Sequence, residues 1–252
     1  MSGLVWLSRR ETLRVSKLWT QTVLAPVISS ALFIVVFGLS LGGRIRGDIQ
    51  GVPYKVFIVP GLITMAMVQA AYANNSASIF QARFDRYIHD VLSAPMRAWQ
   101  MTLGYTVGGV VRASAIGGSL LLISIPLVGA PVHKPVVLVV AVVLALVLFS
   151  SLGTVVGIYA ETWDHTTFIS NIVILPLAFL GGTFYSIDRL PSPWHELSHV
   201  NPLFYLVDAV RYGFLGTSDV SIWLALGVVA GLAMPAYLWA QYLFTTGKRL
   251  KD

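Results

Sequence analysis

The feature that most constrains this sequence is a set of long apolar runs, of which residues 135–159 are the clearest. That run is rich in valine and leucine and contains no Asp, Glu, Lys or Arg. A helix needs about 20 predominantly apolar residues to cross a bilayer. Across the chain 56% of residues are hydrophobic and 11% are charged, whereas soluble domains carry about 25% charged residues. The sequence therefore predicts an integral membrane protein.

Six segments have the length and composition of membrane spans. They are residues 22–43, 56–77, 101–126, 135–159, 167–187 and 221–244. We therefore expect an all-α integral membrane protein with six transmembrane helices, built as a single domain over residues 1–252 without a separate soluble domain. The chain contains no cysteine, which excludes disulfides and thiolate metal sites.

Residues 1–20 have the pattern of an interfacial helix that lies on the membrane surface. On a helical wheel one arc is apolar: Leu4, Leu7, Val15, Leu18 and Trp19. The opposite arc is basic: Arg9, Arg10, Arg14 and Lys17. This amphipathic pattern suits a helix at the lipid headgroups. The alternative interpretation is a charged flank that only orients the first span. We do not expect a cleaved signal peptide, because the arginines interrupt its apolar run.

Residues 79–100, between the second and third spans, are predicted to contain a short amphipathic helix over residues 83–92. Its apolar stripe recurs every three or four residues: Phe84, Tyr87, Ile88, Val91 and Leu92. The other face is polar: Arg83, Asp85, Arg86, His89 and Asp90. This segment is too polar to cross a membrane and too regular to be a simple linker, and Pro95 ends it.

Residues 188–218 are apolar but are interrupted by prolines before any piece can span the bilayer. Asn201 is placed to cap a helix that begins at Pro202 and ends before Gly216. At 1.5 Å per residue that helix is roughly 21 Å long, which enters a bilayer without crossing it. We therefore expect a re-entrant external hairpin between the fifth and sixth spans. Within it, Asp208 and Arg211 have the spacing of an ion pair.

The hairpin region is rich in aromatic and polar side chains that suit an external gate. The candidates are Phe184, Tyr185, Trp194, Asn201, Pro202, Tyr205, Arg211 and Tyr212. The alternative for the aromatic residues is a belt at the membrane interface, where their rings are commonly found. A gate is consistent with the position, since irregular backbone at membrane depth has to be buried in protein or line a cavity.

One charge falls inside a predicted span. Arg112 lies in the third span, where it either faces the bundle or a transport path, or extends to the interface. The same span has Gly104 and Gly108 at a spacing that allows close helix packing.

An HExxH motif, His195-Glu196-Leu197-Ser198-His199, suggests a second class of function, an intramembrane zinc peptidase. Its helix can be only about two turns long between the flanking prolines, and no third ligand is evident. We therefore predict no metal site and no catalytic residues. The chain also lacks a phosphate-binding loop, so uphill transport would draw on an ion gradient or on a separate ATPase. The scarcity of ionisable residues within the spans favours the ATPase.

The charge distribution bears on orientation and partners. The net charge is +6, but the basic residues flank the apolar runs, where the positive-inside rule explains them better than nucleic-acid binding does. With six spans both termini share one side of the membrane. More of the basic residues fall on that side, so we expect both termini in the cytoplasm.

The combination of late motifs identifies a family resemblance that covers essentially the whole chain. The motifs are FIVPGLITM at residues 57–65, AYAN at 71–74, PLAFLGGTFYS at 176–186, LPSPW at 190–194 and NPLFYLVDAVRYGFLG at 201–216. With the order of predicted elements, they resemble the permease subunits of ABC type-2 transporters, and most closely the short bacterial inner-membrane permeases of the YadH kind.

The resemblance implies a multi-pass inner-membrane exporter subunit that contacts membrane lipid and pairs with a second copy of itself as a homodimer. It implies a separate ABC ATPase subunit, which would hold the ATP and Mg, so that this chain binds no cofactor. In the family the amphipathic segment is the coupling helix that docks on the ATPase, the N-terminal helix rests against the same partner, and the re-entrant helices help close the outer end. Cargo ranges over lipid-linked polysaccharides, drugs and other amphiphiles. A membrane scaffold without a transport role is the third candidate function.

Overall fold

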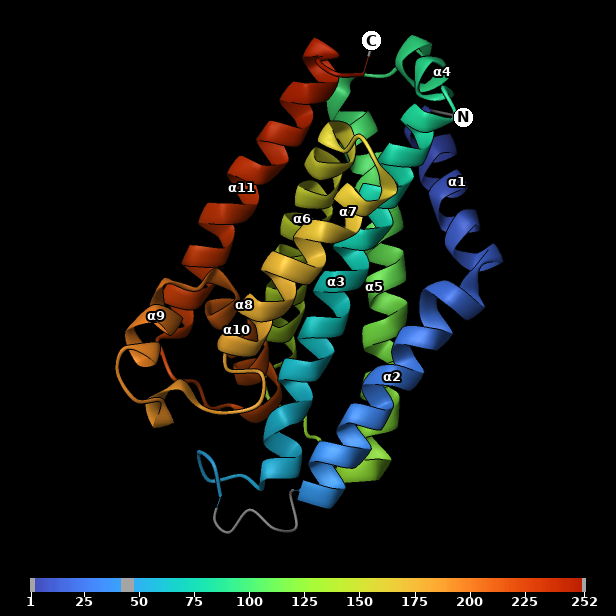
Figure 1. Cartoon of the computed structure of the whole chain (residues 1–252). Helices are drawn as coiled ribbons and strands as arrows, with labels where there is room; N and C mark the ends of the chain where they lie inside the picture. The colour runs from blue at the N-terminus through green and yellow to red at the C-terminus, as the bar shows by residue number, and fades with distance from the viewer. Residues whose placement is uncertain (1–2, 42–47, 251–252) are drawn as a thin grey trace.

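The computed structural model describes residues 3–41 and 48–250, and every regular element in them is helical (Figure 1). The N-terminal part contains α1 Gly3–Lys17, η1 Thr20–Leu24, α2 Ala25–Phe33 and η2 Ile34–Leu41, of which η1 and η2 are π-helical. The central part contains α3 Tyr54–Phe84, α4 Ile88–Ser93, α5 Ala98–Val128 and α6 Pro135–Tyr159. The C-terminal part contains α7 Trp163–Ile169, the π-helical η3 Ser170–Ile174, α8 Leu175–Leu180, the 3-10 turn η4 Ile187–Arg189, α9 Trp194–Val200, α10 Pro202–Leu215 and α11 Ile222–Thr246.

Within the described residues, six helical segments are long and apolar enough to cross a membrane, as predicted. They are Thr20–Gly38, Tyr54–Phe84, Ala98–Val128, Pro135–Tyr159, Trp163–Leu180 and Ile222–Thr246. The fourth has the predicted bounds. The predicted end of the first span, at residues 42–43, lies outside the described residues.

The fifth span differs from its prediction because it ends at Leu180 rather than at residue 187. Gly182, just beyond it, has φ +76°, a left-handed conformation that suits glycine and cannot continue a helix. The Gly182 carbonyl accepts a hydrogen bond from the Arg211 side chain. This bond holds the turn in place, so Phe184 and Tyr185 belong to a loop and not to the span.

The second span, α3, is the centre of the bundle. In its most apolar window 78% of residues are buried, compared with 17% in both the first and the fifth span. Helix α6 packs closely against it through Gly153 and Gly157, where an added Cβ would come within 2.4 Å of the Tyr72 carbonyl oxygen and 2.7 Å of the Ser76 carbonyl oxygen. The small residues of α6 therefore let the two backbones approach.

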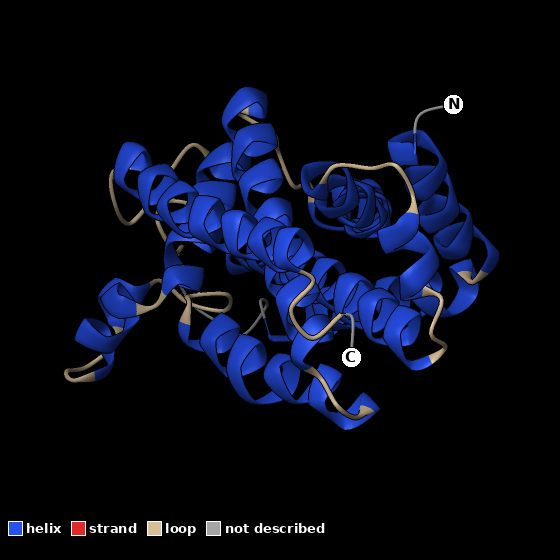
Figure 2. Ribbon diagram, turned by 90° about the horizontal axis from the view of Figure 1, so that it is seen from above, coloured by secondary structure: helices blue, strands red, loops and turns tan. Residues whose placement is uncertain are grey.

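Both ends of the chain lie at one end of the bundle, together with α4 (Figure 1). The connection between α5 and α6 lies at the opposite end. Viewed from above, the long helices pack side by side (Figure 2). The described part of the chain contains no sheet. The chain thus has a terminal end, which carries the N-terminus, the C-terminus and α4, and a distal end.

Helix α10 is too short to span, and it packs inside the bundle against α3, α6 and α11. Its predicted caps are confirmed: the Leu203 backbone N–H donates to Asn201 Oδ1 at 2.9 Å, and Gly216 ends the helix with φ +76°. Asn201 also donates to the Leu177 carbonyl at 2.6 Å, which ties the start of α10 to the fifth span. The α5–α6 connection holds its other end, since the His133 backbone N–H donates to the Phe214 carbonyl at 3.1 Å.

Candidate functional site

The terminal end carries α1, which packs along the first half of α5. Leu7 and Val15 are buried there, as expected for the apolar arc of an amphipathic helix. Two glycines of α5 make room: an added Cβ at Gly104 would meet Leu7 at 2.6 Å, and one at Gly108 would meet Glu11 at 2.8 Å. The predicted glycine spacing thus serves the contact between α1 and α5. Leu18 and Trp19, placed on the same predicted arc, are exposed.

A buried polar cluster that no local sequence pattern predicted joins α1 to α3. Glu11 is fully buried, and its Oε2 accepts from Ser78 Oγ at 2.9 Å and pairs with an Arg14 nitrogen at 3.0 Å. The same Arg14 nitrogen donates to the backbone and side-chain oxygens of Asn74, each at 3.1 Å. A signal was present in the sequence, because Glu11 stands four residues after Leu7 and four before Val15, on the apolar arc.

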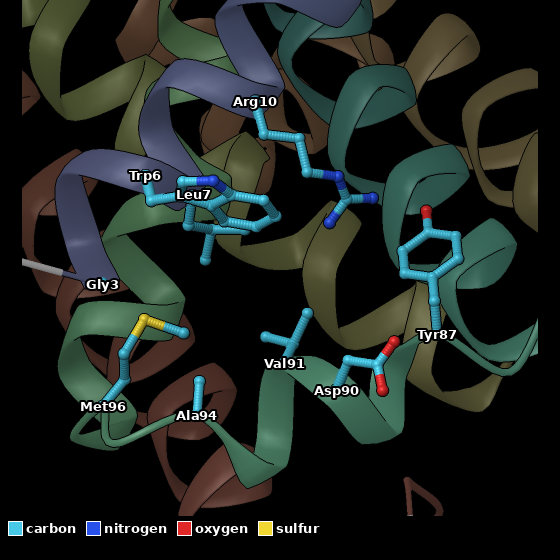
Figure 3. A pocket seen from close by; sticks show the side chains of 9 residues that line it. All are labelled: Gly3, Trp6, Leu7, Arg10, Tyr87, Asp90, Val91, Ala94 and Met96. Atoms are coloured by element: carbon cyan, nitrogen blue, oxygen red, sulfur yellow. The ribbon is translucent and has the colours of Figure 1, made fainter.

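Arg10 connects α1 to the segment that follows α3. Its guanidinium lies over the Tyr87 ring, 4.4 Å from the centroid, and in Figure 3 the two side chains point toward one another. Burial opposes the charge of Arg10, but Tyr87, Tyr105 and Glu11 together favour it more strongly, so the pKa of Arg10 lies above its ordinary value. Burial raises the pKa of the Tyr87 phenol. The pair is therefore a cation over a neutral ring.

Two cavities open on either side of this pair. One, of about 540 Å³, lies between α1 and α4 and is lined by Gly3, Trp6, Leu7, Arg10, Tyr87, Asp90, Val91, Ala94 and Met96 (Figure 3). The other, of about 680 Å³, lies along the basic side of α1 and is lined by Trp6, Arg9, Arg10, Leu13, Arg14, Lys17, Leu18, Gln81 and Tyr87. The predicted basic residues of α1 therefore surround a hollow at the terminal end, except that Arg14 also turns inward to the buried glutamate.

The predicted continuous amphipathic helix over residues 83–92 is wrong. Helix α3 continues to Phe84, a turn follows, and only Ile88–Ser93 form α4. Helix α3 extends beyond the predicted end at residue 77 because Ile79 and Ala82 are buried in the bundle. The break follows Asp85, where Arg86 adopts φ +63°, a conformation that ends a helix.

The turn divides the predicted coupling residues into exposed and anchored groups. Phe84 is 67% exposed, and Asp85, Arg86 and Asp90 are exposed as well. Ile88 and Val91 are buried in a core that also contains Leu7 and Met101. We call residues 84–90, apart from the buried Ile88, the tip. The tip is a surface feature held by buried residues of α4 beneath it.

Arg83 is not part of the exposed surface of the tip. Its side chain donates to the Gly157 carbonyl at 3.3 Å and to the Ala160 carbonyl at 2.8 Å. These groups lie at the C-terminus of α6, where helix carbonyls lack partners within the helix and attract cations. Arg83 therefore links the end of α3 to the end of α6.

At the distal end a buried ion-pair network surrounds Arg211. The predicted pair with Asp208 is present at 3.8 Å, and a second pair with Asp219 measures 3.5 Å. Asp208 also accepts the Asp219 backbone N–H at 2.9 Å, and Asp219 accepts from Ser186 Oγ at 2.8 Å and from the Gln50 side chain. The Arg211 guanidinium lies 4.2 Å from the centroid of the Phe57 ring. This network joins four separate parts of the chain.

The remaining predicted gate residues do not gather around one point. Phe184 packs against Phe37 of η2 at 5.3 Å and against Phe179 at 5.5 Å between ring centroids. Tyr205 Oη donates to the His199 carbonyl at 2.8 Å. The other members range from buried to exposed: Pro202, Tyr185 and Tyr212 are half-buried, Asn201 is buried, and Trp194 is exposed.

The two histidines of the HExxH motif lie side by side on α9, with ring centroids 4.8 Å apart. Glu196 accepts a hydrogen bond from Ser192 Oγ at 3.3 Å. Within the described residues no group of three His, Asp or Glu side chains is arranged to hold a metal ion. A catalytic zinc site needs three protein ligands, so no such site is formed in this part of the chain.

Comparison with known proteins agrees with the sequence resemblance. The family model described as ABC-2 type transporter matches residues 2–215. The chain is 39% identical to the Inner membrane transport permease YadH of Escherichia coli (strain K12) over 257 aligned positions, covering 100% of both chains. It is 28% identical to Nodulation protein J of Rhizobium leguminosarum bv. viciae, covering 97% of this chain and 93% of that one. The chain therefore belongs to the ABC-2 type transporter family, as a non-catalytic membrane permease subunit of the inner membrane.

Proposed function

We propose that this chain is the permease of an exporter that moves an amphiphilic cargo, lipid-like, polysaccharide or drug, across the inner membrane by alternating access. ATP hydrolysis takes place in a separate ABC ATPase subunit, which holds the ATP and Mg. The observation that carries the proposal is the tip: an exposed aromatic and charged surface on a buried base, at the end that holds both termini. Such a surface suits a partner that exerts force.

The position of the tip explains how movement reaches the spans. Phe84 is the last residue of α3, the most buried span, so a displaced tip acts directly on the bundle core. The buried base of the tip contacts α1 and α5, because Ile88 and Val91 share a core with Leu7 and Met101. A partner docked on the tip and on the basic side of α1 therefore moves α1, α3 and α5 together.

A second copy of the chain pairs through the first and fifth spans. These two spans are the least buried of the six, and both flank α3. They expose large apolar side chains, including Ile28 and Leu32 on α2 and Ile172 and Val173 on η3. Such a surface suits lipid or a helical partner. In a symmetric homodimer the faces of the two α3 helices then turn toward one another, which forms a path between the subunits.

Helices α9 and α10 act as the re-entrant external hairpin. The length of α10, its burial against α3, α6 and α11, and its position toward the distal end support this role. The Arg211 network fixes the hairpin to the loops that precede α3 and α11. The terminal end, with its basic α1, then faces the cytoplasm.

The first test is copurification of the tagged chain from native membranes in a mild detergent, followed by mass spectrometry. We expect a stoichiometric partner that contains a phosphate-binding loop. In the purified complex, Phe84→Ala and the double variant Phe84→Ala/Tyr87→Ala should abolish the stimulation of ATP turnover by the permease without affecting membrane insertion. Trp223→Ala, which truncates an exposed aromatic residue at the start of α11, is the matched control. Undiminished stimulation in both tip variants would rule out the tip as the docking surface.

A further inference from the structure

A cavity of about 440 Å³ opens on the face of α3 between the first and fifth spans. Six polar side chains contribute to its lining: Gln21, Ser29, Ser30, Gln69, Arg112 and Ser170. They come from four different helical segments: the first span, α3, α5 and η3. A polar cavity within the membrane-spanning part of a protein is unusual, because a surface facing lipid favours apolar side chains.

Arg112 brings a positive charge to this cavity. It lies near the middle of α5, and its Nε donates to the Thr22 carbonyl at 3.0 Å, which leaves the two terminal nitrogens of the guanidinium without a hydrogen bond in the described part of the chain. Arg14 and Arg211 pair with buried carboxylates. Arg112 pairs with none among the described residues, and the cavity lining contains no Asp or Glu. A cation with free donors and no protein counter-charge favours an anionic ligand.

The other polar side chains of the lining are also available. Gln69 and the three serines make no side-chain hydrogen bond within the described residues. Hydroxyl groups in helices commonly donate to the carbonyl four residues earlier, as Thr64 and Thr154 do here. Because the serines of the cavity do not, their hydroxyl groups can donate to the oxygens of a ligand.

The cavity changes character along its length. Its lining on α3 runs from Ala73 to Leu62, eleven residues along the helix, or roughly 16 Å at 1.5 Å per residue. Gln69 lies toward the Ala73 end, and Arg112 bonds the Thr22 carbonyl beside Gln21. Leu62 and Met65 lie toward the other end of the α3 lining, and α2 adds Phe33 with Ser29 and Ser30 about one turn before it. A ligand that matches this lining has an anionic group at one end and a hydrocarbon chain at the other.

We propose that this cavity binds an anionic amphiphile, whose phosphate or carboxylate group pairs with the guanidinium of Arg112 while its chain lies along Leu62, Met65 and Phe33. The polar end is nearer the terminal end of the bundle, so the ligand enters from the leaflet on that side. As a statement about cargo, the inference rests on the proposed export function. Binding itself does not rest on the export function, and it is measured on the permease alone.

The test uses the purified full chain in a neutral maltoside detergent, with bound ligand counted by native mass spectrometry. The probes are oleoyl lysophosphatidic acid, oleoyl lysophosphatidylcholine and inorganic phosphate. The wild type should prefer the acid over the zwitterion by about tenfold or more, as expected for a charge-assisted pair. Arg112→Gln should remove that preference, and Arg112→Lys should retain part of it because the charge remains without the planar fork.

Two further variants separate binding from structure. Lys134→Gln removes an exposed charge at the distal end and should bind as the wild type does. Gln69→Leu leaves the bond between Arg112 and Thr22 in place and should weaken binding of the acid about threefold or more, as expected for one lost hydrogen bond. If Arg112→Gln and Gln69→Leu both bind the acid as the wild type does, the cavity does not hold the anionic group and the proposal is wrong.

The remaining ligand measurements identify the source of the anion. Inorganic phosphate should displace the lysolipid only at millimolar concentrations, and displacement at micromolar concentrations would show a site for a free anion, which overturns the amphiphile. Equal retention of both lysolipids by the wild type also overturns it. Whether the ATPase copurifies does not depend on these results, so the export proposal and the binding proposal fail separately.

Discussion

A buried glutamate on a peripheral helix is stable only with partners in place, and Glu11 has them on two helices. Ser78 donates to it from α3, and Arg14 pairs with it from α1. Gly108 on α5 leaves the space that the Glu11 side chain fills. The carboxylate thus fixes both the position and the rotation of α1, because an apolar residue in its place would leave Ser78 and Arg14 without their shared acceptor.

Replacing Glu11 with Ala should loosen α1 from the bundle. The expected loss is about 2 kcal/mol, the size of a buried hydrogen bond to a charged group. Thermal unfolding in detergent should show a lower midpoint, and trypsin should cleave faster after Lys17. Glu161→Ala is the control, since Glu161 forms an exposed ion pair with Arg249 and such pairs contribute little. Equal midpoints for the two variants would contradict the role of Glu11.

At the residue scale, prediction from sequence succeeds where the partners are close in the chain. The Asp208–Arg211 pair follows from helical spacing, and it is present. Asp219 and Gln50 join the same network from distant segments. No local pattern identifies them, because their contacts depend on how α10 docks. Glu11 is intermediate: its place on the apolar arc was visible, but its partner Ser78 was not.

At the element scale, the membrane spans were predictable because length and apolarity are local properties. The ends of the spans were less predictable. Helix α3 passes beyond its predicted end because Ile79 and Ala82 find a core to enter, and Gly182 stops the fifth span early because Arg211 holds that turn. Both outcomes depend on contacts between elements, as does the division of the predicted coupling helix at Arg86.

The contact between α3 and α6 depends on glycine. Replacing Gly153 with Ala places a methyl group 2.4 Å from the Tyr72 carbonyl oxygen, so the helices must separate. We expect a destabilisation of about 2 kcal/mol, as for other overpacked cores. Gly231→Ala in α11 is the matched control, because nothing lies within 4 Å of its added Cβ. Chemical denaturation of both variants in mixed micelles checks this, and equal stability would show that α6 can shift freely.

At the scale of the whole molecule, both termini and the tip lie at one end, and the α5–α6 connection lies at the other. Orientation therefore decides which surface meets a cytoplasmic partner. The sequence predicts it only through a modest bias of basic residues, since charge patterns act during insertion and leave no packing signature. The absence of cysteine makes a direct measurement simple.

Single cysteines should report the two ends of the bundle in intact bacterial spheroplasts. His89 on α4 and Lys134 at the start of α6 are both exposed. A membrane-impermeant maleimide should label Lys134→Cys in intact spheroplasts and His89→Cys only after lysis, because the positive-inside rule predicts a cytoplasmic position for α1 and α4. Labelling of both variants after lysis is the control for accessibility. The reverse pattern would place the tip outside and remove it from the reach of an ATPase.

Two of the spans that line the cavity, the first and the fifth, are wound partly as π-helix, in η1, η2 and η3. A π turn holds one residue more than an α turn, so the surplus residue can migrate along the helix while both helix ends stay in place. Each such step rotates the side chains it passes by about 100° and advances them by about 1.5 Å. A change of register of this kind would turn different side chains of the first and fifth spans toward the cavity without requiring either span to tilt or unfold.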